Sequence, residues 1–78
     1  MMIDSIKYKG VDYDARHGGP FDRGSADSYY GRPWQPHYYV GPTGMSDLVS
    51  HQEMTVGEVE AYNAGFDYNE EMGSKKEW

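Results

Sequence analysis

Apolar and polar residues alternate near the start of the chain and take a helical spacing toward its end. In the alternating stretch, the apolar residues are Ile6, Tyr8, Val11 and Tyr13. Lys9-Gly10 interrupts them, so the pattern predicts a β-hairpin over residues 5–16 with its turn at this pair. Because a two-stranded hairpin is marginal alone in water, we expect it to pack on another element.

The stretch "FDRGSADSYYGR" carries the signals of a short helix over residues 22–30. Asp22 is a good N-cap or first-turn residue. Gly31 suits a left-handed C-terminal cap. Arg23 and Asp27 lie four residues apart, so the two side chains can pair on one face of this helix.

A longer amphipathic helix is predicted over residues 55–72. Thr55 and Glu58 have the spacing of a capping box, in which each side chain binds a first-turn amide. The apolar face consists of Val56, Val59, Tyr62 and Phe66, with Gly65 beside it. Gly73 follows as a natural stop, and residues 73–78 form a tail.

The chain is expected to be a small α+β domain spanning residues 1–78. Residues 31–54 are rich in proline, glycine and aromatic side chains, and they predict an ordered loop between the two helices. Leu48 is the only leucine, so aromatic rings must supply much of the core volume. The predicted core residues are Tyr30, Tyr38, Val59, Tyr62, Gly65 and Phe66. Self-association would be a further source of buried surface.

Charge is distributed unevenly. The formal net charge is −6, and residues 53–71 contain six acidic residues and no lysine or arginine. The acids form the solvent-facing side of the predicted second helix, which is lined by Glu60, Ala64, Asp67 and Glu71. Such a face usually gives solubility alone, but it can also dock on a basic surface. The acids taken as partner-binding are Glu60, Asp67, Glu70 and Glu71.

The stretch "DRGSADSYYGRPWQPHYY", residues 22–39, concentrates tyrosine, tryptophan and arginine. These rings are either the core or a binding surface. Arginine between aromatic residues can stack nucleic-acid bases, and it is also common in protein-binding hot spots. We expect Tyr29, Tyr39 and Arg32 to face outward, and Trp34 to be buried with Tyr30 and Tyr38. The residues of this stretch taken as partner-binding are Arg32, Trp34 and Tyr39.

Signals for catalysis are missing from the sequence. His17, His37 and His51 have no metal-binding spacing, no nucleophile motif is present, and the glycines do not form a phosphate loop. We therefore predict a protein that is not an enzyme, with no metal and no cofactor. No apolar run approaches the length of a membrane span, and the first residues lack a signal peptide. We expect a cytoplasmic location and no membrane partner.

Two resemblances add to these predictions. The strings "RGSADSYYGR", "PHYY", "AYNAGF", "NEE" and "KKEW" resemble those of short uncharacterised proteins of tailed bacteriophages, over roughly residues 6–78. This resemblance implies a phage origin and the cytoplasm of a bacterial host, and it implies no activity.

The second, looser resemblance is to ribosome modulation factor and its relatives, which have a helix-loop-helix shape. The matching residues are Gly24, Gly31, Pro36, Tyr38, Tyr62, Gly65 and Phe66. Asp27 stands where that family has a small apolar residue. The acidic composition also differs from that of a ribosomal RNA binder, so direct binding to nucleic acid is not expected.

The sequence therefore predicts a small acidic interaction protein, encoded by a phage, that binds and modulates a host bacterial protein with a basic surface. Two alternatives remain open. One is a modulator that associates with the ribosome or RNA. The other is a binder of a nucleotide or small molecule through the tyrosine and arginine cluster.

Overall fold

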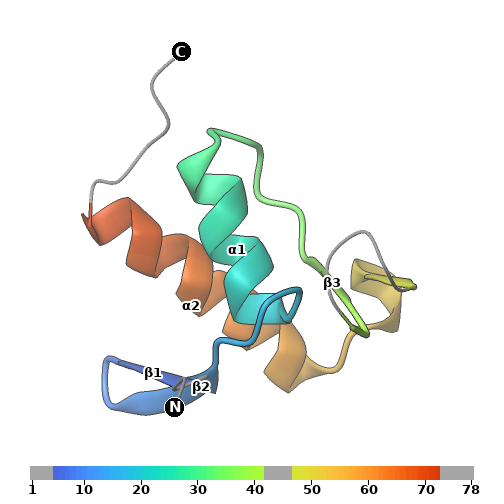
Figure 1. Cartoon of the computed structure of the whole chain (residues 1–78), viewed down its shortest axis with the longest axis horizontal. Helices are drawn as coiled ribbons and strands as arrows, with labels where there is room; N and C mark the ends of the chain where they lie inside the picture. Colours follow the sequence, from blue (N-terminus) through green and yellow to red (C-terminus); the bar gives the residue numbers. More distant parts are fainter. Residues whose placement is uncertain (1–4, 42–46, 73–78) are drawn as a thin grey trace.

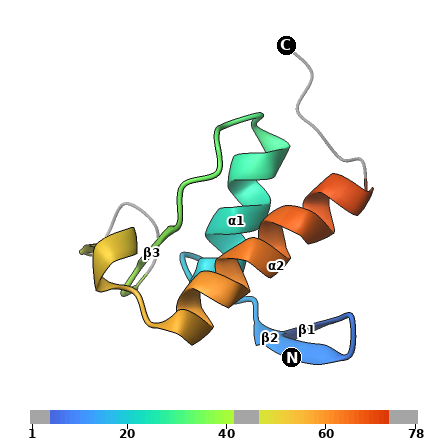
Figure 2. The ribbon, with the colours of Figure 1, turned by 180° about the vertical axis from the view of Figure 1, so that it is seen from behind.

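The computed structural model of the chain describes residues 5–41 and 47–72, which form a small α+β fold (Figure 1). The elements are β1 (Ser5–Tyr8), β2 (Val11–Asp14), α1 (Pro20–Tyr29), β3 (His37–Tyr39), β4 (Leu48–Ser50), a 3-10 turn (His51–Glu53) and α2 (Val56–Met72). The helices cross at the centre, and the β1–β2 hairpin and β3 lie on different sides of them (Figures 1 and 2). The predicted α+β class is confirmed. The predicted tail, 73–78, lies outside the described residues.

The first hairpin forms where the alternation predicts it. β1 pairs with β2 in antiparallel register, with Tyr8 opposite Val11. Lys9 and Gly10 both have positive φ angles, 51° and 80°, as a type I′ hairpin turn requires. The Tyr8 ring meets the Tyr68 ring of α2 edge-on, with centroids 5.7 Å apart. The hairpin therefore packs on the helices, as expected.

The first helix starts at Pro20, two residues before the predicted boundary. Proline is favoured at a first helical position because its missing amide hydrogen has no partner there anyway. Asp22 lies in the first turn, and its carboxylate accepts a hydrogen bond from the Gly18 amide at 3.0 Å. Gly31, with φ of 70°, ends the helix in the predicted left-handed conformation.

Two glycines allow the helices to approach closely. A Cβ atom built on Gly24 of α1 would lie 2.1 Å from the carbonyl oxygen of Tyr62 in α2. A Cβ atom on Gly65 would lie 2.0 Å from the carbonyl oxygen of Phe21 in α1. Each glycine thus contacts the backbone of the opposite helix. The side chains of Phe21 and Tyr62, with 2% and 0% exposure, fill the core beside this crossing.

The prediction of a loop throughout residues 31–54 is wrong at β3 and β4. Tyr38 of β3 lies opposite Val49 of β4 in an antiparallel pair. Each strand has only three residues, which is too short to show a clear alternation between prolines and glycines. The Tyr39 amide also donates to the Gly18 carbonyl oxygen at 2.7 Å, which attaches β3 to the loop before α1. Residues 42–46 lie outside the described part.

The second helix carries the predicted capping box. The Thr55 amide donates to Oε1 of Glu58 at 2.8 Å, and the Glu58 amide donates to Oγ1 of Thr55 at 3.2 Å. The Tyr38 hydroxyl also bonds to Glu58. This bond, together with those from Thr55, lowers the pKa of the Glu58 carboxyl. The start of α2 is therefore tied to β3.

The core differs from the prediction at Tyr30 and Phe21, and Val56 of the predicted apolar face is 76% exposed at the start of α2. Tyr62 and Gly65 are buried as predicted, and Tyr38, Val59 and Phe66 are partly buried. The prediction that Tyr30 is buried is wrong, because its side chain is 37% exposed. Tyr30 is the C-cap residue of α1, beyond the face that contacts α2, and its ring instead meets the Tyr29 ring edge-on. Phe21, which the sequence reasoning missed, is buried in the core.

Candidate functional site

The acidic residues of α2 divide into two groups. Glu60 and Asp67 are exposed, and no hydrogen bond or ion pair joins either side chain to another residue of 5–41 or 47–72. Glu71 pairs with Lys9 of the hairpin turn, with Oε1 and Nζ 3.4 Å apart. Glu70 accepts a hydrogen bond from the buried Ser28 hydroxyl of α1. Glu70 and Glu71 are therefore exposed, as predicted, but each also serves a contact within the fold.

Trp34 lies beside the acidic side of α2. The expectation that Trp34 is buried is wrong, because it is 50% exposed. Its Nε1 donates to Oδ1 of Asn63 at 2.6 Å. Asn63 follows Glu60 by three residues and precedes Asp67 by four, so the three share one face of α2. The structure thus brings Trp34 together with two of the predicted acids.

Arg32 and Tyr39 lie apart from this face. The Arg32 guanidinium is 3.5 Å from Asp27 and 4.8 Å from the centre of the Tyr30 ring. Tyr39 is partly buried in β3, where its ring lies 5.9 Å from the Arg23 guanidinium. The predicted partner-binding residues therefore do not form one continuous set.

A groove separates the first hairpin from α2. It has a volume of about 250 Å³. Its lining consists of Tyr8, Lys9, Val11 and Tyr13 from the hairpin and Glu60, Asn63, Ala64 and Asp67 from α2. One wall is therefore mainly aromatic and apolar, and the other carries two carboxylates. The prediction that Ala64 lies on the solvent side with the acids is wrong, because Ala64 is only 6% exposed where it lines this groove.

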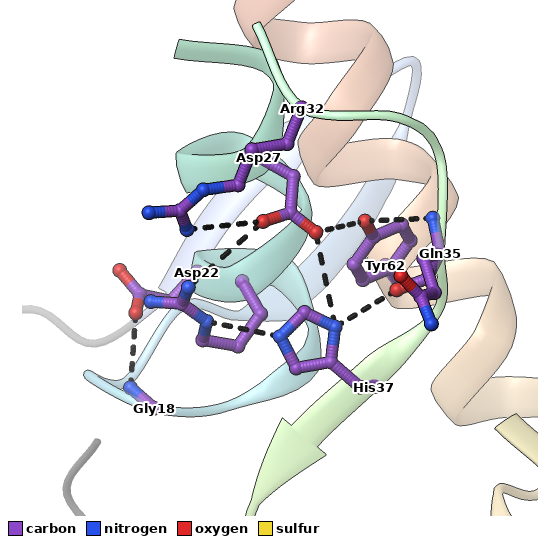
Figure 3. Close-up of polar contacts among 8 residues, drawn as sticks. Gly18, Asp22, Asp27, Arg32, Gln35, His37 and Tyr62 are labelled. Carbon is purple, nitrogen blue, oxygen red and sulfur yellow. Dashed lines mark hydrogen bonds and ion pairs between the residues drawn. The ribbon is translucent and has the colours of Figure 1, made fainter. Parts of the chain in front are cut away.

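A second polar cluster surrounds Asp27, which is only 3% exposed (Figure 3). The Tyr62 hydroxyl donates to Oδ2 of Asp27, and Arg32 approaches Oδ1. Arg23 lies 3.9 Å from the same Oδ1, so the predicted pair of Arg23 and Asp27 forms. Burial and the neighbouring Asp27 carboxylate raise the pKa of the Tyr62 hydroxyl, which stays a hydrogen-bond donor.

His37 completes this cluster from β3. Its Nδ1 lies 2.8 Å from the Gln35 carbonyl oxygen, which can only accept, so Nδ1 carries the proton. Its Nε2 then accepts from Nε of Arg23 at 3.4 Å. Both ring nitrogens are used within the fold, and so are both oxygens of Asp27. The cluster therefore joins α1, β3 and α2, and its polar atoms are directed at one another.

The burial of Asp27 is the feature that sequence reasoning missed. The sequence signal for this burial was the position of Asp27 on α1, three residues after Gly24. The two helices come closest at Gly24. An aspartate at this position must be paired, and Arg23, Arg32 and Tyr62 are the residues of the right chemistry nearby.

A wider hollow of about 510 Å³ lies beside β3 and β4. It is lined by Gln35, Pro36, His37, Tyr39, Leu48, Ser50, His51 and Gln52. No arginine is among these lining residues, but the Arg23 guanidinium lies 5.9 Å from the centre of the Tyr39 ring. Within the part of the chain that the structure describes, no group of three histidine or carboxylate residues is placed to hold a metal ion.

Comparison of the chain with protein-family models, curated proteins and solved structures found no match. Among the described residues, neither helix is long and apolar enough to cross a membrane. The arrangement of residues at the surface is therefore the basis for a proposed function.

Proposed function

We propose that this chain is a small interaction protein, without catalysis, that binds a bacterial host protein with a basic surface. The observation that supports this proposal is the placement of Glu60 and Asp67. Both are exposed on the face of α2 to which the half-exposed Trp34 is hydrogen-bonded through Asn63. Unpaired acids attract a basic partner over a distance, and an indole supplies apolar contact area at the centre of an interface. The phage origin rests on the resemblance of the sequence strings.

The arginines support this proposal over binding to RNA. Arg23 and Arg32 both lie within 4 Å of the buried Asp27 carboxylate, at 3.9 and 3.5 Å. Arg16 donates from its backbone amide to Asp14 and from Nη2 to the Tyr39 carbonyl oxygen. Phosphate binding needs basic groups that are not already neutralised. The Arg23 and Arg32 guanidinium groups thus share an acid, although the Arg32 side chain is 53% exposed, and that of Arg16 binds a carbonyl oxygen. Glu60 and Asp67 are exposed and have no ion-pair partner among the described residues.

The proposal is tested by capturing partners from bacterial lysate with the tagged chain, with and without nuclease. One host protein retained in stoichiometric amount after nuclease and released by high salt is the expected result, because salt screens exposed charges. Loss of every partner after nuclease would instead favour the ribosome or RNA alternative.

Charge variants locate the binding surface. We expect Glu60→Lys with Asp67→Lys to abolish capture, because both changes reverse charge on the α2 face. The matched control is Asp47→Lys with Glu53→Lys, which makes the same total charge change at exposed residues near β4. The control should retain the partner. Equal loss in the two variants would show that overall charge, and not this face, determines binding.

A further inference from the structure

The groove between the β1–β2 hairpin and α2 has two acidic side chains on its helix wall. Glu60 and Asp67 are seven residues apart on α2, which places them about 10 Å apart along the helix axis. The Asn63 side chain lies between them. In the described part of the chain, neither carboxylate has an ion-pair partner. The helix wall of the groove therefore presents negative charge that the fold does not use.

The opposite wall is aromatic and held in place. The Tyr8 ring is packed edge-on against Tyr68, and the Tyr13 ring lies 5.6 Å from that of Phe21 in the core. Val11 is 49% exposed on the same side of the hairpin as Tyr8, since the two are directly paired across the strands. This wall supplies ring faces and apolar surface to a neighbour, without a need for the rings to rearrange.

Lys9 shows this chemistry within the molecule itself. Its ammonium lies 5.2 Å from the centre of the Tyr8 ring and 3.4 Å from Oε1 of Glu71. A cation is thus already held between a hairpin tyrosine and an α2 carboxylate at the edge of the groove. Since Glu71 neutralises Lys9, the remaining charge of the groove comes from Glu60 and Asp67.

We propose that this groove binds an arginine side chain of the protein partner. The inference rests on the proposed function and specifies the chemistry that the α2 face recognises. Arginine is favoured over lysine because a planar guanidinium both stacks on aromatic rings and donates paired hydrogen bonds to carboxylates. Its aliphatic stem would lie along Val11 and the tyrosine rings. At about 250 Å³, the groove is smaller than the ~300–1,000 Å³ of typical ligand pockets, which suits one side chain.

The test uses the full chain and N-acetyl-arginine amide, with N-acetyl-citrulline amide as the matched probe. Citrulline has nearly the same shape as arginine and carries no charge. Amide shifts are followed by NMR during each titration. We expect the arginine probe to shift Tyr8, Tyr13 and Asn63 with saturation, and the citrulline probe to bind at least threefold more weakly. Equal effects of the two probes, or no shift at these residues with arginine, would overturn the inference.

Two variants with the same net charge test whether binding of the arginine probe depends on the groove carboxylates. Glu60→Gln with Asp67→Asn removes both groove carboxylates, and binding of the arginine probe should weaken about fivefold or more. Asp47→Asn with Glu53→Gln removes two acids outside the groove lining and should leave binding within about twofold. All four residues are exposed, so circular dichroism should show unchanged folds. Equal weakening in both variants would assign the binding to the general acidity of the chain.

The inference and the proposed function fail in different ways. In one outcome the arginine probe does not bind, but charge reversal at Glu60 and Asp67 still abolishes partner capture. The α2 face is then an interface that does not recognise arginine. In the other outcome the probe binds in the groove, but the same charge reversal leaves partner capture unchanged. The groove then binds arginine, and the partner binds at another surface.

Discussion

Asp27 is a buried acid in a core that has few aliphatic side chains. Its side chain is 4% exposed, and its carboxylate is surrounded by two arginines, a histidine and the Tyr62 hydroxyl (Figure 3). A buried ion pair adds little net stability compared with apolar residues of the same size. Removal of one member is costly, however, because the others then keep charges without a partner. Substitution of Asp27 therefore tests how much this cluster contributes to the stability of the fold.

Asp27→Asn should destabilise the protein by about 3 kcal/mol, because Arg23 and Arg32 lose their shared counter-charge. The free energy of unfolding is measured by urea titration. Asp22→Asn is the matched control. Asp22 is only partly buried and accepts one hydrogen bond from Gly18, so we expect a loss of about 1 kcal/mol. Similar losses in the two variants would contradict a central role for Asp27.

Glu58 makes stability depend on pH through the start of α2. Bonds from Tyr38 and Thr55 lower its pKa below the ordinary value of 4.5. A carboxyl with a lowered pKa stabilises the folded state above its ordinary pKa and loses this effect as the pH falls through the folded value. We expect thermal stability to fall below pH 4.5, and to fall less in Glu58→Gln, which keeps a capping side chain without a titrating charge. An identical acid profile in the variant would exclude this contribution.

At the scale of the elements, the helix crossing is held by backbone contact. Gly24 and Gly65 each face a carbonyl oxygen of the opposite helix, with no room for a methyl group. This arrangement sets how closely α1 and α2 approach. It also explains why Phe21 and Tyr62, the residues whose carbonyl groups are contacted, are among the most deeply buried side chains.

Gly65→Ala should therefore destabilise the fold by about 2 kcal/mol or more, because the helices must separate to admit the methyl group. Gly57→Ala serves as the control in the same helix. A Cβ atom there meets only the Thr55 hydroxyl, at 4.0 Å, and alanine is the better helix former, so stability should rise by up to about 1 kcal/mol. Thermal unfolding measures both effects. Unchanged stability in Gly65→Ala would show that the helix crossing tolerates a wider spacing.

The elements were predictable where local chemistry decides them. Lys9-Gly10 fixes the first turn, Gly31 ends α1, and Thr55 with Glu58 starts α2, and each signal lies within a few residues of the feature it determines. β3 and β4 were missed because each has three residues, and their pairing depends on partners distant in sequence. The ion pair of Lys9 with Glu71 was missed for the same reason, because it joins the hairpin to α2 and its two residues are distant in sequence.

At the scale of the whole molecule, the sequence predicts an acidic face on α2. It does not show which of these acids make contacts within the fold and which stay available to a partner. The sequence places all the acids of residues 53–71 on a segment without bases. The fold then assigns Glu58 to a helix cap, Glu70 to Ser28 and Glu71 to Lys9, and leaves Glu60 and Asp67 beside a groove. The proposed site therefore exists only when the hairpin is docked on α2.

This dependence gives a prediction for Tyr68, whose ring joins the hairpin to the helices through contacts with Tyr8 and Phe21 at 5.7 Å. Tyr68→Ala should raise hydrogen exchange in β1 and β2 more than at the helix crossing, since a two-stranded hairpin is marginal once its packing is lost. Binding of N-acetyl-arginine amide should weaken in parallel, because Tyr8 no longer forms the groove wall. Tyr29→Ala is the control, as Tyr29 contacts Tyr30 at the far end of α1. If hairpin protection were unchanged in Tyr68→Ala, the hairpin would fold independently of α2, and the groove would not depend on this aromatic contact.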